Sequence, residues 1–174
     1  YDVAIHFSES KIDAQNLREQ LEQFGIKAAC LEADLMDDQQ ISSLVERACD
    51  KLGNELTLLI NNASIFEYDN METLSLKSWD RHIGSNLKAP LFLMQEFFKQ
   101  ISEGSEDLKG ENIPRGNVIN IADQRVLKKT PEFFTYSLAK MGLWSLTQIA
   151  AQALAPRVRV NASRNASRSF TGLG

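Results

Sequence analysis

The sequence is poor in the features that mark secreted, membrane-spanning or metal-binding proteins. It has two cysteines in 174 residues, Cys30 and Cys49, and neither lies in a CxxC pair or a Cys/His cluster. These are too few for a disulfide framework, and their spacing predicts no metal site, so we expect a reducing, cytoplasmic environment. The longest apolar runs, such as 56–60, fall far short of the ~18 residues that a membrane span requires.

The sequence also lacks a large excess of charge of either sign. The chain has 19 basic and 23 acidic residues, a formal charge of −4, and this mild acidity argues against nucleic-acid binding. The one basic cluster comprises Arg125, Lys128 and Lys129, and we expect it to lie in a solvated loop. With 43% apolar and 24% charged residues, the composition is that of one globular domain that folds without a metal or disulfide.

Short apolar, β-rich runs alternate with stretches of helical period, which is the pattern of βαβ units in a parallel sheet. The sequence therefore predicts an α/β fold: a single, three-layer domain with a doubly wound, Rossmann-like parallel sheet. In such sheets, ligand-binding residues lie at the carboxyl ends of the strands. The predicted strands cover 3–7, 26–31, 56–61, 117–121 and 157–161, and the predicted helices cover about 10–25, 41–53, 78–101 and 133–154.

Local signals refine the helices. Ser10 with Asp13 resembles a capping box, and Gly53 is expected to end the second helix. Pro90 is expected to kink the long helix over 78–101, and His82 on this helix is expected at the surface. The polar segment 102–116 reads as an exposed loop.

The most informative pair of residues is Tyr136 and Lys140. A spacing of four places both side chains on one face of a helix, so the ammonium can lie near the phenol and near the ribose of a bound nucleotide. A nearby cation favours the phenolate, and we expect it to lower the pKa of Tyr136 toward the working range of a general acid or base. Because YxxxK also occurs by chance, the accompanying motifs decide its meaning.

Four motifs accompany this pair in order along the chain: EADL at 32–35, NNAS at 61–64, GSNLKAP at 84–90 and INIAD at 119–123. Together with YxxxK they resemble the short-chain dehydrogenase/reductase family, and the resemblance runs from residue 1 to about residue 162. It implies that Tyr136 donates or takes a proton, that Lys140 holds the nicotinamide ribose, and that Asn86 supports a water relay.

Position 123 departs from the usual pattern of this family, because Asp123 stands where a serine is common. A carboxylate cannot donate the hydrogen bond that a serine hydroxyl offers to a substrate carbonyl. An acid here resembles the pteridine reductase branch, and Ser64 and Phe66 match that branch as substrate-binding residues. Reduction of a dihydropterin needs a hydride at a ring carbon and a proton at the adjacent nitrogen, so Asp123 beside Tyr136 could share and pass a proton. Phe66 is expected to stack on the flat substrate.

The end of the first predicted strand favours NADPH as the cofactor. NAD-preferring enzymes usually place an acid there that takes both ribose hydroxyls, whereas Ser8, Ser10 and Lys11 could serve a 2′-phosphate. Glu9 works against this assignment, because its carboxylate would repel the phosphate. The resemblance implies cofactor contacts from residues at the strand ends and on the Tyr136 helix: His6, Ser8, Asp34, Leu35, Asn61, Ala63, Ser64, Ile121, Tyr136 and Lys140.

Two segments of the family pattern are missing from the sequence: the glycine-rich turn near the N-terminus, and the Pro-Gly loop, substrate lid and last strand that should follow the strand at 157–161. The glycine-rich turn that binds pyrophosphate is absent because the chain starts at what resembles the second strand, and the slot of the first strand is expected to leave an unpaired hydrophobic sheet edge. We therefore assign 1–162 to a dinucleotide-binding oxidoreductase domain, incomplete at its N-terminus. Residues 163–174 are interpreted as an atypical tail of joined or truncated segments.

The leading hypothesis is the NADPH-dependent reduction of dihydropteridine- or dihydrofolate-type substrates, with Tyr136 as the proton donor. Two alternatives stay open: a generic carbonyl or alcohol oxidoreductase, and a catalytically silent nucleotide-binding module. The resemblance also implies a homotetramer that pairs through the helices at 78–101 and 133–154. The expected partners are a pterin and further copies of the chain, with no nucleic acid and no membrane.

Overall fold

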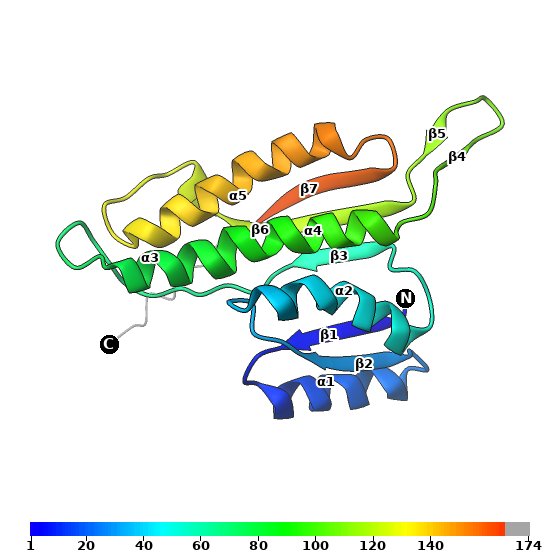
Figure 1. Ribbon diagram of the computed structural model, residues 1–174, viewed down its shortest axis with the longest axis horizontal. Helices are drawn as coiled ribbons and strands as arrows, with labels where there is room; N and C mark the ends of the chain where they lie inside the picture. Colours follow the sequence, from blue (N-terminus) through cyan, green and yellow to red (C-terminus); the bar gives the residue numbers. More distant parts are fainter. Residues whose placement is uncertain (166–174) are drawn as a thin grey trace, which may run out of the picture.

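The computed structural model describes residues 1–165 of the chain (Figure 1). Parallel strands alternate with helices over most of this length, as predicted. The elements, in chain order, are β1 (Val3–Phe7), α1 (Lys11–Gln23), β2 (Ala28–Glu32), α2 (Asp38–Leu52), β3 (Leu58–Asn61), α3 (Leu76–Ile83), η1 (Gly84–Lys88), α4 (Ala89–Gln100), β4 (Ser105–Glu106), β5 (Asn112–Ile113), β6 (Gly116–Asp123), η2 (Gln124–Val126), α5 (Phe134–Ala153) and β7 (Val158–Asn165).

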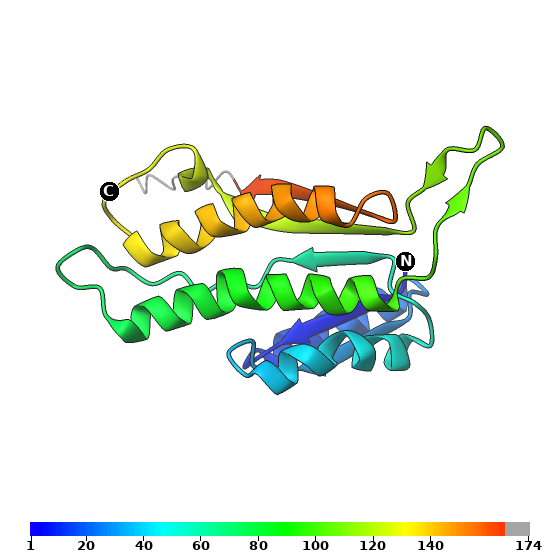
Figure 2. The same ribbon diagram turned by 45° about the horizontal axis from the view of Figure 1, so that its top comes forward.

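The main strands are all parallel to their partners. β6 lies between β3 and β7, and β1 pairs with β2. Helices α2, α4 and α5 cover one face of these strands, and α1 covers the other (Figures 1 and 2). The predicted Rossmann-like α/β fold with helices on both faces is confirmed. It places the carboxyl ends of β1, β3 and β6 along one edge of the molecule.

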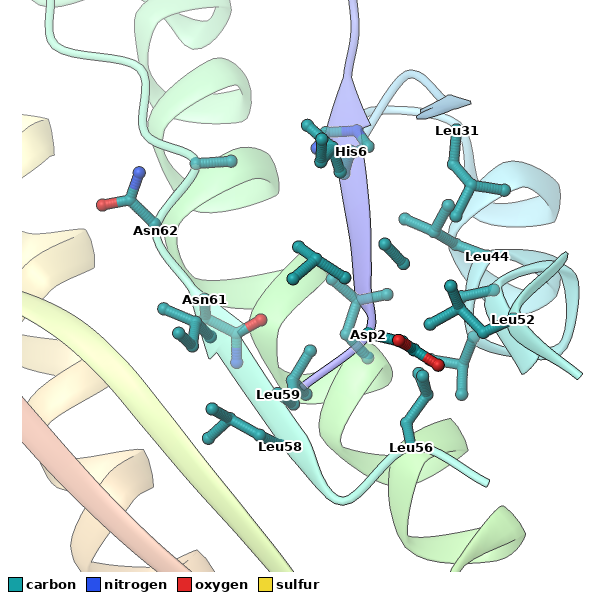
Figure 3. Close-up of a pocket in the computed structure, with 18 of the residues that line it drawn as sticks. Asp2, His6, Leu31, Leu44, Leu52, Leu56, Leu58, Leu59, Asn61 and Asn62 are labelled. Atoms are coloured by element: carbon teal, nitrogen blue, oxygen red, sulfur yellow. The ribbon is translucent and has the colours of Figure 1, made fainter. Parts of the chain in front are cut away.

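An apolar slot divides the predicted single sheet into two. β1–β2 and β3–β6–β7 are separate hydrogen-bonded sheets among the described residues, and a cavity of about 780 Å³ lies between β1 and β3. Leucines from several elements line it, including Leu31, Leu44, Leu56 and Leu59 (Figure 3). This slot is the unpaired hydrophobic edge expected from the sequence, because the facing edges of β1 and β3 do not pair with each other.

Local capping signals account for the ends of α2 but not for the start of α1. The Asp37 carboxylate accepts hydrogen bonds from the backbone N–H groups of the first turn of α2, and Gly53 ends that helix at a φ of 74°. The capping box predicted at Ser10 and Asp13 is wrong. Ser10 has φ −79° and ψ 52°, which is not the extended conformation of a cap, and its side chain makes no capping hydrogen bond.

The long helix predicted over 78–101 is interrupted by the π-helical turn η1. It starts at Leu76, earlier than predicted, behind a capping box formed by Ser75 and Ser78. The wider turn falls just before Pro90, which lacks the N–H that a regular α-helix would use there. A side chain at Gly84 would meet the Met36 methyl carbon at 2.6 Å, so glycine allows the close approach of η1 to the loop after β2.

Two further boundaries differ from the prediction. β7 continues past Asn161 to Asn165, because β6 extends to Asp123 and supplies backbone partners along the whole length. Residues 163–165 of the predicted tail are therefore strand, and residues 166–174 lie outside the described residues. The segment 102–116 is exposed except near its end, as predicted for a loop, but it carries the short antiparallel hairpin β4–β5.

Candidate active site

Three of the predicted catalytic residues form one buried cluster at the carboxyl end of β6. The Tyr136 hydroxyl donates to Asp123 Oδ2 at 3.2 Å, and Lys140 Nζ donates to the backbone oxygen of Ile121 at 2.9 Å. The helical spacing of four does place Tyr136 and Lys140 on the same face of α5, and both are at most 5% exposed. The Ser64 hydroxyl, from the segment after β3, completes the cluster by a hydrogen bond with Tyr136.

The phenol of Tyr136 is held in its protonated form. Burial raises the pKa of Tyr136 to about 12, and the Asp123 carboxylate contributes by repelling the phenolate and accepting the phenol proton. Ser64 and Arg125 act in the opposite direction. The expectation that Lys140 lowers this pKa is wrong, because its ammonium points to Ile121 and lies 5.8 Å from the ring centroid. Asp123, by contrast, touches the hydroxyl directly.

Lys140 is a buried cation with hydrogen-bonding capacity to spare. Burial lowers the pKa of Lys140 from 10.5 to about 8, and the charge of Asp123 limits this fall. The side chain therefore remains largely protonated at neutral pH. An ammonium has three N–H donors, and Ile121 takes one of them, so two can be directed at hydroxyl groups such as those of a ribose.

A cationic aromatic wall, formed by Phe66, Phe133 and Arg125, borders Tyr136. The Phe66 and Phe133 rings stack with centroids 4.3 Å apart and planes 9° apart, and the Arg125 guanidinium lies 4.8 Å from the Phe133 centroid. Arg125 also pairs with Asp123 at 3.4 Å. The prediction of a solvated loop holds for Lys128 and Lys129, which are exposed, but is wrong for Arg125, whose guanidinium contacts Phe133 and Asp123.

Phe66 keeps an open surface although Phe133 covers one of its faces. It is 53% exposed, and the edge-to-face contact with Tyr136 has a centroid distance of 4.7 Å. Phe133 sits at the start of α5 with a φ of 55°, a left-handed conformation that is uncommon for a bulky residue. This backbone turn places its ring against Phe66. Phe133 is not among the site residues predicted from the sequence, although its position just ahead of the YxxxK motif is a signal that could have pointed to it.

The two predicted asparagines use their side chains within the protein. Asn86, fully buried in η1, donates from Nδ2 to the Ile65 oxygen at 2.9 Å and accepts from the Ile65 N–H at 3.2 Å. It therefore holds the segment that carries Ser64 and Phe66. Asn61 Nδ2 donates to Asn120 Oδ1 at 2.8 Å, so its amide joins β3 to β6 inside the core.

The residues predicted to bind the adenosine part of a cofactor lie across the slot from Tyr136. His6 Nε2 donates to the Ala33 oxygen at 2.9 Å, and His6 stands at the end of β1 beside the slot, opposite Asn62 (Figure 3). Asp34 is exposed and caps the next turn through the Met36 N–H, whereas Leu35 packs in the core. Ala63 lines the slot, and Ser8 lies exposed just past the end of β1.

A second buried polar group lies behind the aromatic wall. His82, expected at the surface, is fully buried, because α3 packs this face against α5 and the loop after β3. Its Nδ1 lies 2.6 Å from Thr135 Oγ1, and the Thr135 hydroxyl donates to Asp69. Sequence reasoning missed Asp69 and Thr135. The spacing of four between His82 and the inward-facing Asn86 could have shown that His82 points inward.

The fold and the site together define a class of protein. Parallel α/β units present a tyrosine and a lysine, one helical turn apart, at the carboxyl end of a central strand, beside the ends of strands that suit a dinucleotide. The family described as short chain dehydrogenase matches residues 1–166 of this sequence. The chain therefore belongs to the short-chain dehydrogenase family.

Individual relatives carry different activities. An alternative dihydrofolate reductase, FolM, from Brucella canis, solved in complex with NADP, is 40% identical over 93% of this chain and 62% of its own, with a TM-score of 0.83. A short chain dehydrogenase from Burkholderia cenocepacia, also solved with NADP, is 25% identical with a TM-score of 0.82, over 92% of this chain and 62% of its own. The 3-oxoacyl-[acyl-carrier-protein] reductase FabG of Staphylococcus aureus is 26% identical over 93% of this chain and 62% of that protein.

The matches also give the extent of the chain. The uncharacterized oxidoreductase YjdA of Bacillus subtilis is 27% identical over 158 residues, which are 90% of this chain and 60% of that protein. The chain thus spans about 60% of the length of the curated relatives it matches. Between residues 1 and 165, no helix has the length and apolarity needed to cross a membrane, and no group of three or more potential ligands could hold a metal ion.

Proposed function

We propose that the intact protein reduces dihydropteridine- or dihydrofolate-type substrates with NADPH, and that Tyr136 supplies the proton. The observation that carries this proposal is the hydrogen bond between Tyr136 and Asp123 beside the aromatic wall. A reaction at a ring C=N bond needs a renewable proton source and a flat, apolar surface, and this site offers both. The similarity to FolM, an alternative dihydrofolate reductase, supports the same substrate class.

Several side chains suit NADPH. Two N–H donors of Lys140 remain for ribose hydroxyls, and the exposed Ser8, Ser10 and Lys11 follow β1, where they could receive a 2′-phosphate. Glu9 opposes the phosphate charge, so the hydroxyls and Lys11 must outweigh it. Two structurally similar proteins, from Brucella canis and Burkholderia cenocepacia, were solved with NADP, which supports the same cofactor here.

Different residues of the chain have different roles in the proposed reduction. NADPH, when bound, supplies the hydride to a ring carbon of the substrate. Tyr136 gives its proton to the adjacent nitrogen, and the Ser64 hydroxyl and the positive charge of Arg125 favour the phenolate that this leaves. Asp123, in contact with the phenol oxygen, is placed to take up a proton from solvent and pass it to the phenolate, which restores both groups. Phe66 holds the flat ring system through its open surface.

A carbonyl reductase is the second candidate. The similarity to FabG favours it, since FabG is named as a reductase of 3-oxoacyl groups. In that reaction a hydrogen-bond donor at position 123 would stabilise the developing alkoxide, and the Asp123 carboxylate cannot be that donor while ionised. Asp123 therefore separates the two candidates.

Substitutions at Asp123 test the proposal on the intact protein. Asp123→Asn keeps the shape and removes the group that can take up and release a proton, so we expect kcat/KM for 7,8-dihydrobiopterin to fall by about 100-fold or more. Asp123→Ser should raise activity on a small β-ketoester, because it restores the hydroxyl donor. Undiminished pterin reduction by Asp123→Asn, or a wild-type preference for the ketoester, would exclude the pteridine assignment.

Assembly and location form part of the same proposal. Apolar side chains on the outer faces of α4 and α5 remain exposed, including Phe92 at 43% and Ile149 at 63%. Copies of the chain that pair through these helices would bury them, which supports a homotetramer.

Among the described residues neither Cys30 nor Cys49 forms a disulfide, which agrees with a reducing, cytoplasmic location.

A further inference from the structure

The helix that carries Tyr136 has no N-terminal cap of its own. Its N-cap residue is Phe133, whose side chain makes no capping hydrogen bond. Asp69, 66 residues earlier, takes this place: its Oδ1 accepts from the Thr135 N–H at 3.1 Å, and its backbone oxygen accepts from the Phe134 N–H at 3.3 Å. A carboxylate at this end also complements the helix dipole. The start of α5 is thus held by the loop after β3.

The buried triad of Asp69, Thr135 and His82 has one consistent set of proton positions. The Glu67 N–H donates to His82 Nε2 at 3.1 Å, so Nε2 carries no proton and Nδ1 does. Nδ1 then donates to the Thr135 hydroxyl at 2.6 Å, which in turn donates to Asp69. Each donor in this series of hydrogen bonds has one acceptor. Each triad residue is at most 1% exposed.

The charge states agree with this arrangement. Burial lowers the pKa of His82, which favours the neutral ring that the Glu67 contact requires. Burial alone would raise the pKa of Asp69, but hydrogen bonds from Thr135 and Ser78 lower it below its ordinary value. The triad therefore holds one carboxylate and one neutral imidazole, with a hydroxyl between them.

The triad and the Glu67 backbone bonded to it adjoin two residues of the site, Phe66 and Tyr136. Glu67 follows Phe66, Thr135 precedes Tyr136, and the His82 and Tyr136 rings lie 6.0 Å apart, edge to face. A shift of the loop relative to α5 would move Phe66 away from Tyr136. The Lys140 contact with Ile121 lies one turn further along α5 and does not involve this loop.

We propose that Asp69, Thr135 and His82 are positioning residues that lock the Phe66 loop onto the first turn of α5 and so fix the position of the substrate-binding Phe66 ring relative to the Tyr136 hydroxyl. This inference rests on the proposed function for its catalytic readout. The triad touches none of the reacting atoms. We therefore expect the triad to affect substrate binding and the order of the Phe66 loop. We expect it to leave cofactor binding unchanged.

Paired substitutions at Thr135 test the inference in the intact protein. Thr135→Val keeps the shape and removes the hydroxyl, so we expect KM for 7,8-dihydrobiopterin to rise at least 10-fold while the NADPH Kd, from fluorescence titration, stays within 3-fold. Amide hydrogen exchange of segment 66–70 should accelerate at least 10-fold. Thr135→Ser restores the hydroxyl and should return all three quantities to within 3-fold of wild type.

Two further variants guard the interpretation. Thr147→Val removes another buried threonine hydroxyl from the same helix, where it bonds to Asn120 and Leu143, and it should alter stability without changing KM or the exchange of segment 66–70. Asp69→Asn, of equal size, should shift KM and exchange in the same direction as Thr135→Val. A wild-type KM and exchange rate in Thr135→Val, or equal effects from Thr147→Val, would overturn the inference. Failure of the wild type to reduce dihydropterin would instead refute the proposed function, and the exchange data would still test the triad.

Discussion

Replacing Lys140 by methionine should stabilise the chain when no NADPH is present. Lys140 is only 3% exposed, and its pKa falls from 10.5 in a solvated lysine to about 8 in the folded protein. Each pKa unit corresponds to about 1.36 kcal/mol, so keeping this buried side chain protonated at pH 7 costs roughly 3 kcal/mol. The lost hydrogen bond to Ile121 offsets about 1 kcal/mol of the gain. We expect a net stabilisation of about 2 kcal/mol.

The sign of the pH dependence follows from the same values. Between about pH 8 and 10.5, the unfolded chain binds a proton at Lys140 that the folded chain has released. The free energy of unfolding of the wild type therefore rises with pH in this window, and the rise from this group is absent in Lys140→Met. Above the window the lysine is neutral in both states, so the advantage of the variant disappears.

Urea unfolding of both proteins, followed by circular dichroism at pH 7 and pH 10.5, measures this difference. The arginine variant Lys140→Arg is the control, because it keeps a buried charge and should not be stabilised. Activity should be lost in Lys140→Met, since the donors for the ribose are removed, so stability and function would change in opposite directions. A Lys140→Met protein that is less stable than wild type at pH 7, or that keeps the wild-type rise with pH, would refute the reasoning.

Two other predictions concern the proposed activity and assembly. Tyr136→Phe removes the proton donor but keeps the ring that packs against Phe66, so kcat for 7,8-dihydrobiopterin should fall by about 100-fold or more with little change in NADPH binding; comparable turnover in the variant would contradict the assignment of Tyr136. Light scattering of the intact protein at micromolar concentration should give the mass of a tetramer, and Ile149→Lys, on the exposed face of α5, should lower that mass because a charge cannot be buried unpaired in the interface. A monomer mass for the wild type would mean that the outer faces of α4 and α5 are covered in another way.

Most of the fold could be predicted because its signals are local. The alternation of apolar runs and helical periods predicted five of the strands and all the main helices, and it placed the motif residues at strand ends. The i, i+4 spacing of Tyr136 and Lys140 was sufficient to place both on one face of α5. Errors at this level arose from backbone geometry, as at Ser10, whose dihedral angles do not suit a cap.

The site was predictable only in part because its chemistry depends on contacts between distant segments. The sequence predicts Arg125 as one of three cations in a solvated loop, and only the folded turn after β6 shows that it pairs with Asp123 and packs on Phe133. The pKa of Tyr136 was predicted in the wrong direction, because the sequence shows that Lys140 is near but not that its ammonium bonds to Ile121 while Asp123 reaches the phenol.

The sequence by itself determined the class of fold, the family, and the residues that we propose carry the chemistry, since these depend on residue type and on spacings of a few positions. The tertiary structure decided the burial of those residues and the groups that surround them. Asp69 caps a helix 66 residues away, and His82 is buried rather than exposed. Such contacts depend on how loops close and helices pack, and burial and the distance to neighbouring charges, which set a pKa, exist only after the chain has folded.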